Sequence, residues 1–448
     1  FADPVLQFAS LQGGLAWSLD SGGPSPILEL RAEGLSFSSA DMAGEVSGSW
    51  RSTGRSTRGE IDLTASLERA NAARVARYLP LVVDPAVRAW VGRAINTGNV
   101  GASRFRLRGD LADFPFRDPA QGEFRIESQF DQLTLAHTPG WPAIERIQGS
   151  LVFDRAAMQI DAAGADFLGV RLAPVRAGIS ELSQPVLRIA GDARGELQDM
   201  LRFVENSPLR TRVPEAMRSW RLGGEANLGL NLDIGLARGG KAEYRGRLDL
   251  RDNQLAVDPA LPGLESVGGQ VVFDATGVRS VEPLQARLLG GPSRWRFEAP
   301  ASGGLTLSAE GDASARMLLA QGGAHWAERA AGEIPWRGSL EFDSSKVSAR
   351  LESDLVGTTL NLPAPMAKQP GERWPLRVDW VRALGSPAAA SESVSLRLRS
   401  DLRMRAERPA SGTHSAWRGA IALGVDPLIP AQGLALDLRL PALDGDAW

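Results

Sequence analysis

The sequence predicts a mainly β fold: an elongated repeat of antiparallel strands, curled into a twisted hydrophobic groove, with short helical inserts. Three observations lead to this prediction. Apolar and polar residues alternate over many short stretches, Gly, Pro, Asp and Asn separate these stretches, and helical patterns recur between groups of them. Because successive side chains of a strand point to opposite faces, the alternation gives one apolar and one polar face, as in antiparallel sheets.

The clearest strand pattern spans residues 394–404. Apolar residues occupy the even positions there, with Ser400 as the only polar member, while Arg397, Arg399, Arg403 and Arg405 lie at odd ones, so we expect a single strand. These arginines fit a solvated outer face better than a site for anionic head groups. The same alternation recurs at residues 124–130, 228–234, 248–250, 305–307 and 434–440.

Helical signals are local. Asp84 is a good N-cap, Pro85 suits the first helical position, and Gly98 is expected to end that helix. Residues 197–204 form a second amphipathic stretch, and Pro214 is expected to start a further helix. We therefore place helical inserts near residues 67–96, 196–221 and 314–331, and expect the second helix of each to carry one tryptophan: Trp90, Trp220 and Trp326.

An internal repeat organises the strands. Pro142–Asp154 matches Pro262–Asp274 without gaps, sharing Pro, Glu, Gly, Val, Phe and Asp. Stacked repeats of this kind give a series of similar units. We expect residues 1–66 to end one β repeat, and 67–195, 196–313 and 314–448 each to combine a helical insert with a β-groove repeat, the last one truncated.

Composition limits the possible functions. A formal net charge of -3 and only two tyrosines argue against nucleic-acid binding, and the lack of cysteine excludes thiol chemistry and cysteine-ligated metals. No apolar run approaches the roughly 20 residues that cross a bilayer. No signal peptide is visible, so we expect an internal segment of a longer protein, with any anchor and export signal outside it.

Catalytic motifs are weak. Gly235–Ala242 resembles a phosphate-binding loop, but Ala242 replaces the required Ser or Thr and a strand pattern follows, so we predict a hairpin turn. His137, His325 and His414 are isolated from other metal ligands. Carboxylates are spread over the polar strand faces. The sequence pattern does not single out two of them as the catalytic pair of a glycosidase. We predict no enzyme, no catalytic residue, no metal site and no cofactor.

Several segments resemble, in order, the YhdP family of AsmA-like proteins. These segments are Tyr78–Pro80, Val87–Val91, Leu107–Leu111, Phe114–Phe116, Gly122–Phe124, Gly140–Pro142, Phe203–Leu209 and Thr359–Pro365. The resemblance implies a periplasmic protein that is anchored in the inner membrane by a segment outside this chain. It also implies a hydrophobic groove that carries phospholipids between the inner and outer membranes and supports outer-membrane integrity.

The strand pattern alone leaves the apolar faces two possible locations: between two packed sheets, or along a trough. The first location would suit a non-enzymatic scaffold or assembly factor for outer-membrane proteins, and the second a lipid conduit. For the conduit we expect phospholipids and the two membranes as partners and no nucleic acid, and the sequence does not identify protein partners. The resemblance favours the conduit. The residues expected to line its groove (the groove-lining set) are Phe124, Ile126, Phe130, Leu133, Leu135, Leu151, Phe153, Leu228, Leu230, Leu232, Leu248, Leu250, Val271, Phe273, Leu305, Leu307, Leu396, Leu398, Leu436 and Leu438.

Overall fold

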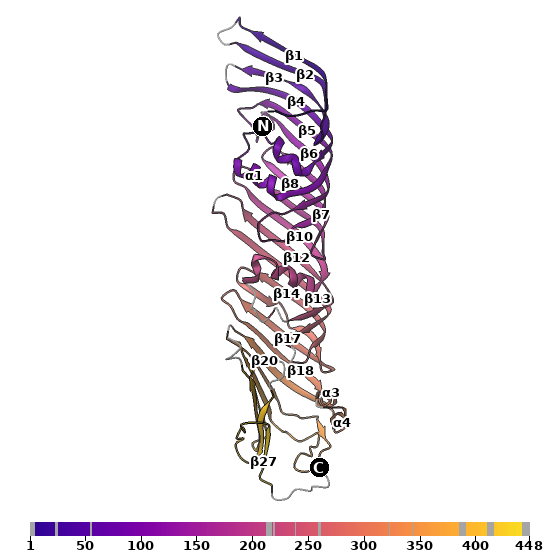
Figure 1. Ribbon diagram of the computed structural model, residues 1–448, viewed down its shortest axis with the longest axis vertical. Helices are drawn as coiled ribbons and strands as arrows, with labels where there is room; N and C mark the ends of the chain where they lie inside the picture. The colour runs from indigo at the N-terminus through magenta and orange to yellow at the C-terminus, as the bar shows by residue number, and fades with distance from the viewer. Residues whose placement is uncertain are drawn as a thin grey trace. The chain divides into compact units, whose positions relative to one another are not determined.

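The computed structural model is mainly β, with 61% strand and 10% helix, which confirms the predicted fold class (Figure 1). It describes residues 5–22, 26–53, 56–211, 217, 220–237, 239–258, 261–321, 323–343, 345–384, 391–409 and 416–440. Within that part of the chain, 25 strands form one hydrogen-bonded sheet and two short strands form a second. The chain divides into two compact units, and each is described by itself.

The first unit comprises Phe1–Gly195, Asp199–Pro208 and Asn227–Gly246. From β1 to β10 each strand pairs antiparallel with the next. This is the hairpin order that short Gly- and Asp-rich connections favour. The strands are β1 (Ser10–Asp20), β2 (Ile27–Ser38), β3 (Met42–Thr53), β4 (Ser56–Asn71), β5 (Ile95–Asp110), β6 (Gly122–Leu135), β7 (Ile144–Asp154), β8 (Ala157–Phe167), β9 (Val170–Ile179), β10 (Val186–Glu196) and β12 (Glu225–Gly235).

The second unit comprises Glu196–Gln198, Leu209–Ala226 and Arg247–Trp448. It is also antiparallel, except that the last two strands pair parallel. Its strands are β11 (Arg221–Gly223), most of β13 (Ala242–Ala256), β14 (Leu264–Asp274), β15 (Gly277–Ser280), β16 (Leu284–Leu288), β17 (Gly291–Pro300), β18 (Leu305–Ser314), β19 (Ala330–Ala331), β20 (Glu333–Phe342), β21 (Lys346–Ser353), β22 (Thr359–Leu360), β23 (Leu376–Ala383), β24 (Ser391–Leu398), β25 (Leu402–Pro409), β26 (Arg418–Leu423) and β27 (Leu434–Leu438).

Short helices occur where inserts were predicted: η1 (Ala72–Tyr78), α1 (Pro85–Ala94), α2 (Leu197–Glu205), η2 (Pro208–Thr211), α3 (Ala315–Ala320) and α4 (Ala324–Ala327). The Asp84 carboxylate accepts a hydrogen bond from Ala86 N at 2.7 Å, and this confirms the predicted N-cap.

The predictions that Gly98 ends a helix and that Trp220 lies on one were wrong. Gly98 does not end α1, because the helix stops at Ala94 and β5 begins at once. Gly98 instead lies within β5 at φ 134°, where a Cβ would come within 2.8 Å of Leu133 Cα. Close strand pairing therefore explains this glycine better than a helix C-cap. Pro214 lies outside the described residues, and Trp220 directly precedes β11 instead of lying on a helix.

The stretch at residues 394–404 is a hairpin, so the prediction of a single strand was wrong. β24 ends at Leu398, β25 begins at Leu402, and Arg399 turns the chain at φ 56°. Leu398 pairs with Leu402 and Leu396 with Met404. Even positions thus oppose even positions, so the apolar face passes through the turn and the periodicity cannot reveal it.

The other local predictions agree with the structure. The Gly235–Ala242 segment connects β12 to β13 as a turn, and Gly235 N donates to Lys241 O at 2.9 Å. The two matched segments become β7 and β14, which begin and end at equivalent residues. Arg146 and Ser266, also equivalent, both take a left-handed conformation. The internal match therefore extends to the local backbone.

Candidate functional site

A continuous apolar face crosses the first unit. Directly paired residues of antiparallel strands place their side chains on the same face. Ala65 of β4 pairs with Phe105, Phe105 with Ile126, and Ile126 with Phe153. The row continues on the following strands through Met158, Ile179 and Leu187. A neighbouring row follows the order Leu67, Ser103, Ser128, Leu151, Ile160, Ala177 and Ile189.

Large side chains extend this face through the first strands. Trp17 of β1 pairs with Leu30, Leu30 with Trp50, and Trp50 with Ile61. The cover over the face decreases toward β1, because Trp17 is 72% exposed whereas Trp50 is half-buried. Leu15, Trp17 and Leu19 of β1 are exposed together, and a contiguous apolar patch of this kind marks a surface that contacts something apolar.

The opposite face of the first unit is polar. Arg106 pairs with Asp62 across β4 and β5, Arg125 lies 3.0 Å from Asp154, and Arg176 lies 3.5 Å from Asp161. These ion pairs are largely solvent-exposed. Each strand therefore separates a water-facing polar side from an apolar side, as the alternation predicts.

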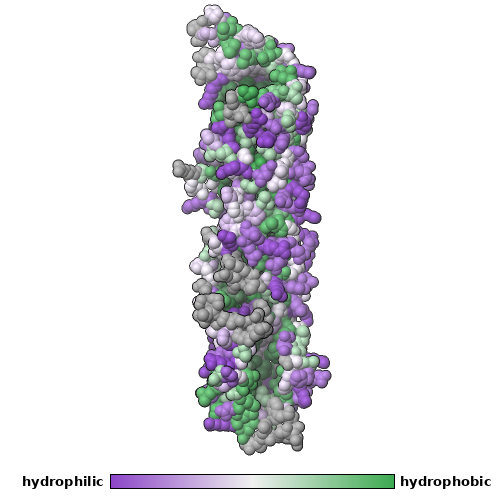
Figure 2. Space-filling view, viewed as in Figure 1, coloured by the Kyte–Doolittle hydropathy of each residue, from purple (hydrophilic) through white to green (hydrophobic). Residues whose placement is uncertain are grey.

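The second unit repeats this arrangement. Leu307 pairs with Leu340, which is followed along the row by Ala349, Trp380 and Val394. A parallel row runs from Val378 to Leu396, Met404, Ile421 and Leu436. Figure 2 shows apolar residues in a hollow in the lower part of the view, where the strands of this unit lie.

The groove-lining set falls into three groups by exposure. Leu436 and Leu438 are exposed, at 65% and 38%. Four residues are buried beneath other side chains: Val271, Leu305, Leu307 and Leu398. The remaining members are half-buried: Phe124, Ile126, Phe130, Leu133, Leu135, Leu151, Phe153, Leu228, Leu230, Leu232, Leu248, Leu250, Phe273 and Leu396.

The structure brings some of this set together and separates others. The Phe124 and Phe153 rings lie 6.3 Å apart on the apolar face of the first unit. Leu250 instead packs against a small buried cluster of Leu264, Val267 and Ala286 in the second unit. Leu250 therefore belongs to a core cluster, whereas Phe124 contacts Phe114 and Phe153 belongs to the half-buried row that begins at Ala65.

In the first unit, connecting segments cover parts of the apolar face. Phe114, on the loop between β5 and β6, lies 5.0 Å from the Phe124 ring, and Phe116 beside it is fully buried. The loop is fixed by Arg117, whose guanidinium forms two 2.9 Å hydrogen bonds with the Glu181 carboxylate. These bonds and those from Ser183 lower the pKa of Glu181 to about 2.

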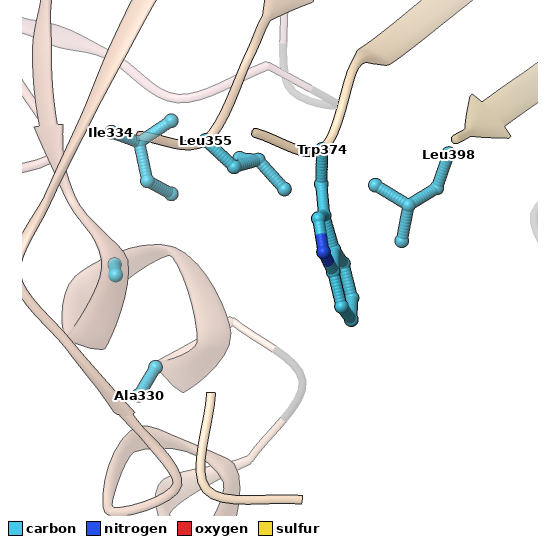
Figure 3. Packing of buried hydrophobic residues seen from close by; sticks show 6 residues of the cluster. Ala330, Ile334, Leu355, Trp374 and Leu398 are labelled. Carbon is cyan, nitrogen blue, oxygen red and sulfur yellow. The ribbon is translucent and has the colours of Figure 1, made fainter. Parts of the chain in front are cut away.

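In the second unit, the connection between β21 and β23 forms a strap over the apolar face, which we define as residues 354–375. Figure 3 shows Trp374 between Leu355 and Leu398. Arg399 holds the strap in place: its guanidinium lies 4.4 Å from the Trp374 ring centroid and donates to Pro365 O at 3.3 Å. The sequence placed Arg399 on the solvated outer face of a strand. That prediction was wrong, because Arg399 lies in a turn.

Strand periodicity did not point to Trp374 or to the strap, because the one strand within the strap, β22, is only two residues long. The sequence offers two signs of it: the Thr359–Pro365 segment of the family resemblance, and Trp374-Pro375 directly before β23. The strap packs against Ile334 and Leu398 of the apolar face. The rows of the first unit through Ile126 and Leu151 stay half-buried, whereas Leu307, Leu340 and Trp380 of the second unit are buried.

A cleft of about 960 Å³ lies where β4 and β5 meet η1. It is lined mainly by polar residues, among them Arg69, Asn71, Arg74 and Asn99, and no member of the groove-lining set borders it. Its polar lining distinguishes this cleft from the apolar face.

Histidines and acidic residues form no metal centre in the described part of the chain. His137 is half-buried beside Trp141, at 5.6 Å between ring centroids, and burial lowers its pKa. His325 stacks near Trp326, and His414 lies outside the described residues. Among the described helices, none is long and apolar enough to span a membrane.

Comparison with known proteins adds a further finding. The family model described as YhdP protein matches residues 1–448. The intermembrane phospholipid transporter YhdP of Escherichia coli strain K12 is 23% identical over 337 residues, which cover 71% of this chain and 25% of that protein. The chain therefore spans about a quarter of the length of this relative. No solved structure matches the chain.

Proposed function

The chain belongs to the YhdP family, and from this we propose that it forms one section of a conduit that carries phospholipids between two membranes along its apolar face. The observation that supports this most directly is the row from Ala65 through Phe105, Ile126 and Phe153. Large apolar side chains follow one another across successive strands there and stay half-buried.

The energetics suit lipid tails. Exposing an acyl chain to water costs about 0.8 kcal/mol per CH₂ group, and an apolar face removes that cost wherever the chain lies on it. A face built from similar side chains in every row offers similar contact energy at each position. Such a surface lets a tail move from row to row, whereas a single deep pocket would hold it.

The half-buried and exposed members of the groove-lining set, apart from Leu250, supply the proposed contacts with a lipid tail, and its four buried members pack in the protein interior. We assign the chain to the periplasm, attached to the inner membrane by a segment outside it, since the named relative is an intermembrane transporter. The role is non-enzymatic, and outer-membrane integrity would depend on it.

Site-specific photo-crosslinking tests the proposal. A benzophenone amino acid at Ile126 should give covalent adducts with phospholipid in cells, because this side chain lies on the apolar face. The matched position is Gln129, on the same strand and exposed on the polar side, where no lipid adduct should form. Equal lipid labelling at both positions would contradict the proposal, and adducts with outer-membrane proteins at Ile126 would favour the scaffold role instead.

A further inference from the structure

One end of the apolar face in the second unit carries charge. The row Leu305, Phe342 and Val347 continues on the next strands as Arg382, Glu392 and Arg408. These three share the face of the apolar rows, because each lies two residues from an apolar member: Trp380, Val394 and Ala406. Charges on such a face are costly unless something uses them or they are fully paired.

The four charges of this site, which we call the charged cluster, are arranged in two layers. Glu392 accepts hydrogen bonds from Trp380 Nε1 at 2.7 Å and from Arg408 Nε at 2.8 Å, and its side chain is 2% exposed. Asp258 pairs with Arg382 at 2.5 Å and is 7% exposed. The side chains of Arg382 and Arg408 are 23% and 32% exposed.

The two arginine side chains are therefore more exposed than the two carboxylates that pair with them. Burial alone would raise the pKa of Glu392, but the hydrogen bonds from Trp380 and Arg408 and the two positive charges lower it, so the carboxylate stays ionised. The buried carboxylates orient the guanidiniums, and Trp380 and Trp417 stack on them at 5.1 Å and 4.7 Å. A guanidinium has five N–H donors in a fork that matches phosphate oxygens.

The spacing fits one phospholipid. Residues two apart along a strand are about 6.8 Å apart, so the two steps from the Glu392 row to the Leu396 row cover about 14 Å. One leaflet of a bilayer holds its tails in about 15 Å. The strap covers the Leu398 end of these rows, so the charged cluster is the end at which a head group can lie beside its tails.

We propose that the charged cluster binds the phosphate of a phospholipid through Arg382 and Arg408, while the tails lie on the rows of Val394 and Leu396. This site rests on the proposed lipid-carrying function and adds a head-group contact to it. The apolar face then distinguishes phospholipids from lipids that have the same tails and no phosphate.

The test compares binding of fluorescent phosphatidylglycerol and fluorescent diacylglycerol with the same tails. The variant Arg408→Gln/Glu392→Gln removes one charge of each sign, and a glutamine can still accept from Trp380. The control, Arg418→Gln/Glu407→Gln, removes an exposed ion pair on the polar side of β25 and β26. We expect the wild type and the control to prefer phosphatidylglycerol about tenfold, and the variant to lose that preference while still binding diacylglycerol.

Three outcomes would overturn the site. The first is an unchanged preference in the variant. The second is an equal loss in the control. The third is competition by free inorganic phosphate as strong as that by the lipid, which would point to an anion site unrelated to lipid. Should the wild type bind neither lipid, the proposed function itself fails. If the double variant does not fold, Arg408→Lys decides, because it keeps the charge but not the fork and should reduce the preference about threefold.

Discussion

Replacing Trp374 by alanine should loosen the strap over the second unit. Trp374 is 7% exposed and lies between Leu355 and Leu398. Truncating a buried Trp to Ala costs about 3–5 kcal/mol. Loss of the Arg399 contact at 4.4 Å adds about 0.5–1 kcal/mol. We therefore expect the free energy of unfolding of this region to fall by about 3.5–6 kcal/mol.

Hydrogen exchange, followed peptide by peptide in increasing urea, would measure this change in the second unit alone. Peptides from the strap and from β23 to β25 should lose protection together, since their side chains form one cluster. The matched control is Trp17→Ala, because Trp17 is 72% exposed, and its change should stay within about 0.5 kcal/mol. A similar effect in both variants would refute the assignment of the strap as a packed cover.

Two further predictions concern the first unit. Gly98→Ala should lower the melting temperature, because Gly98 has φ 134° and a Cβ there would come within 2.8 Å of Leu133 Cα. The expected strain is about 1–3 kcal/mol. The control Gly371→Ala should leave the melting temperature unchanged, because no atom lies within 4 Å of the added Cβ. For Glu181, a carboxyl pKa of about 2 against 4.5 normally means that its ion pair with Arg117 stabilises the fold fully above pH 4.5, and that this is lost as pH falls through about 2. A carboxyl NMR titration should find that low value and see it rise toward the usual one in Arg117→Ala; an unchanged value in that variant would contradict the pairing.

The helix capped by Asp84 and the hairpin turn at Gly235–Ala242 were predictable, because both depend on residues a few positions apart. The match between Pro142–Asp154 and Pro262–Asp274 likewise foretold two strands with equivalent ends. The hairpin at Arg399 was not predictable from alternation, since even positions pair with even positions across a three-residue turn. Gly98 was misassigned because a glycine required by close strand pairing looks the same in sequence as one that ends a helix.

The sequence by itself determined that this protein consists of two-faced antiparallel strands, because alternation is a property of each strand alone. Only the tertiary structure decided where the apolar face is covered by the strap and where it carries charge. Asp258 and Arg382 are 124 positions apart, and Trp374 reaches Leu398 across a hairpin. Such contacts depend on how strands align in the sheet, and no local pattern of residues encodes that alignment.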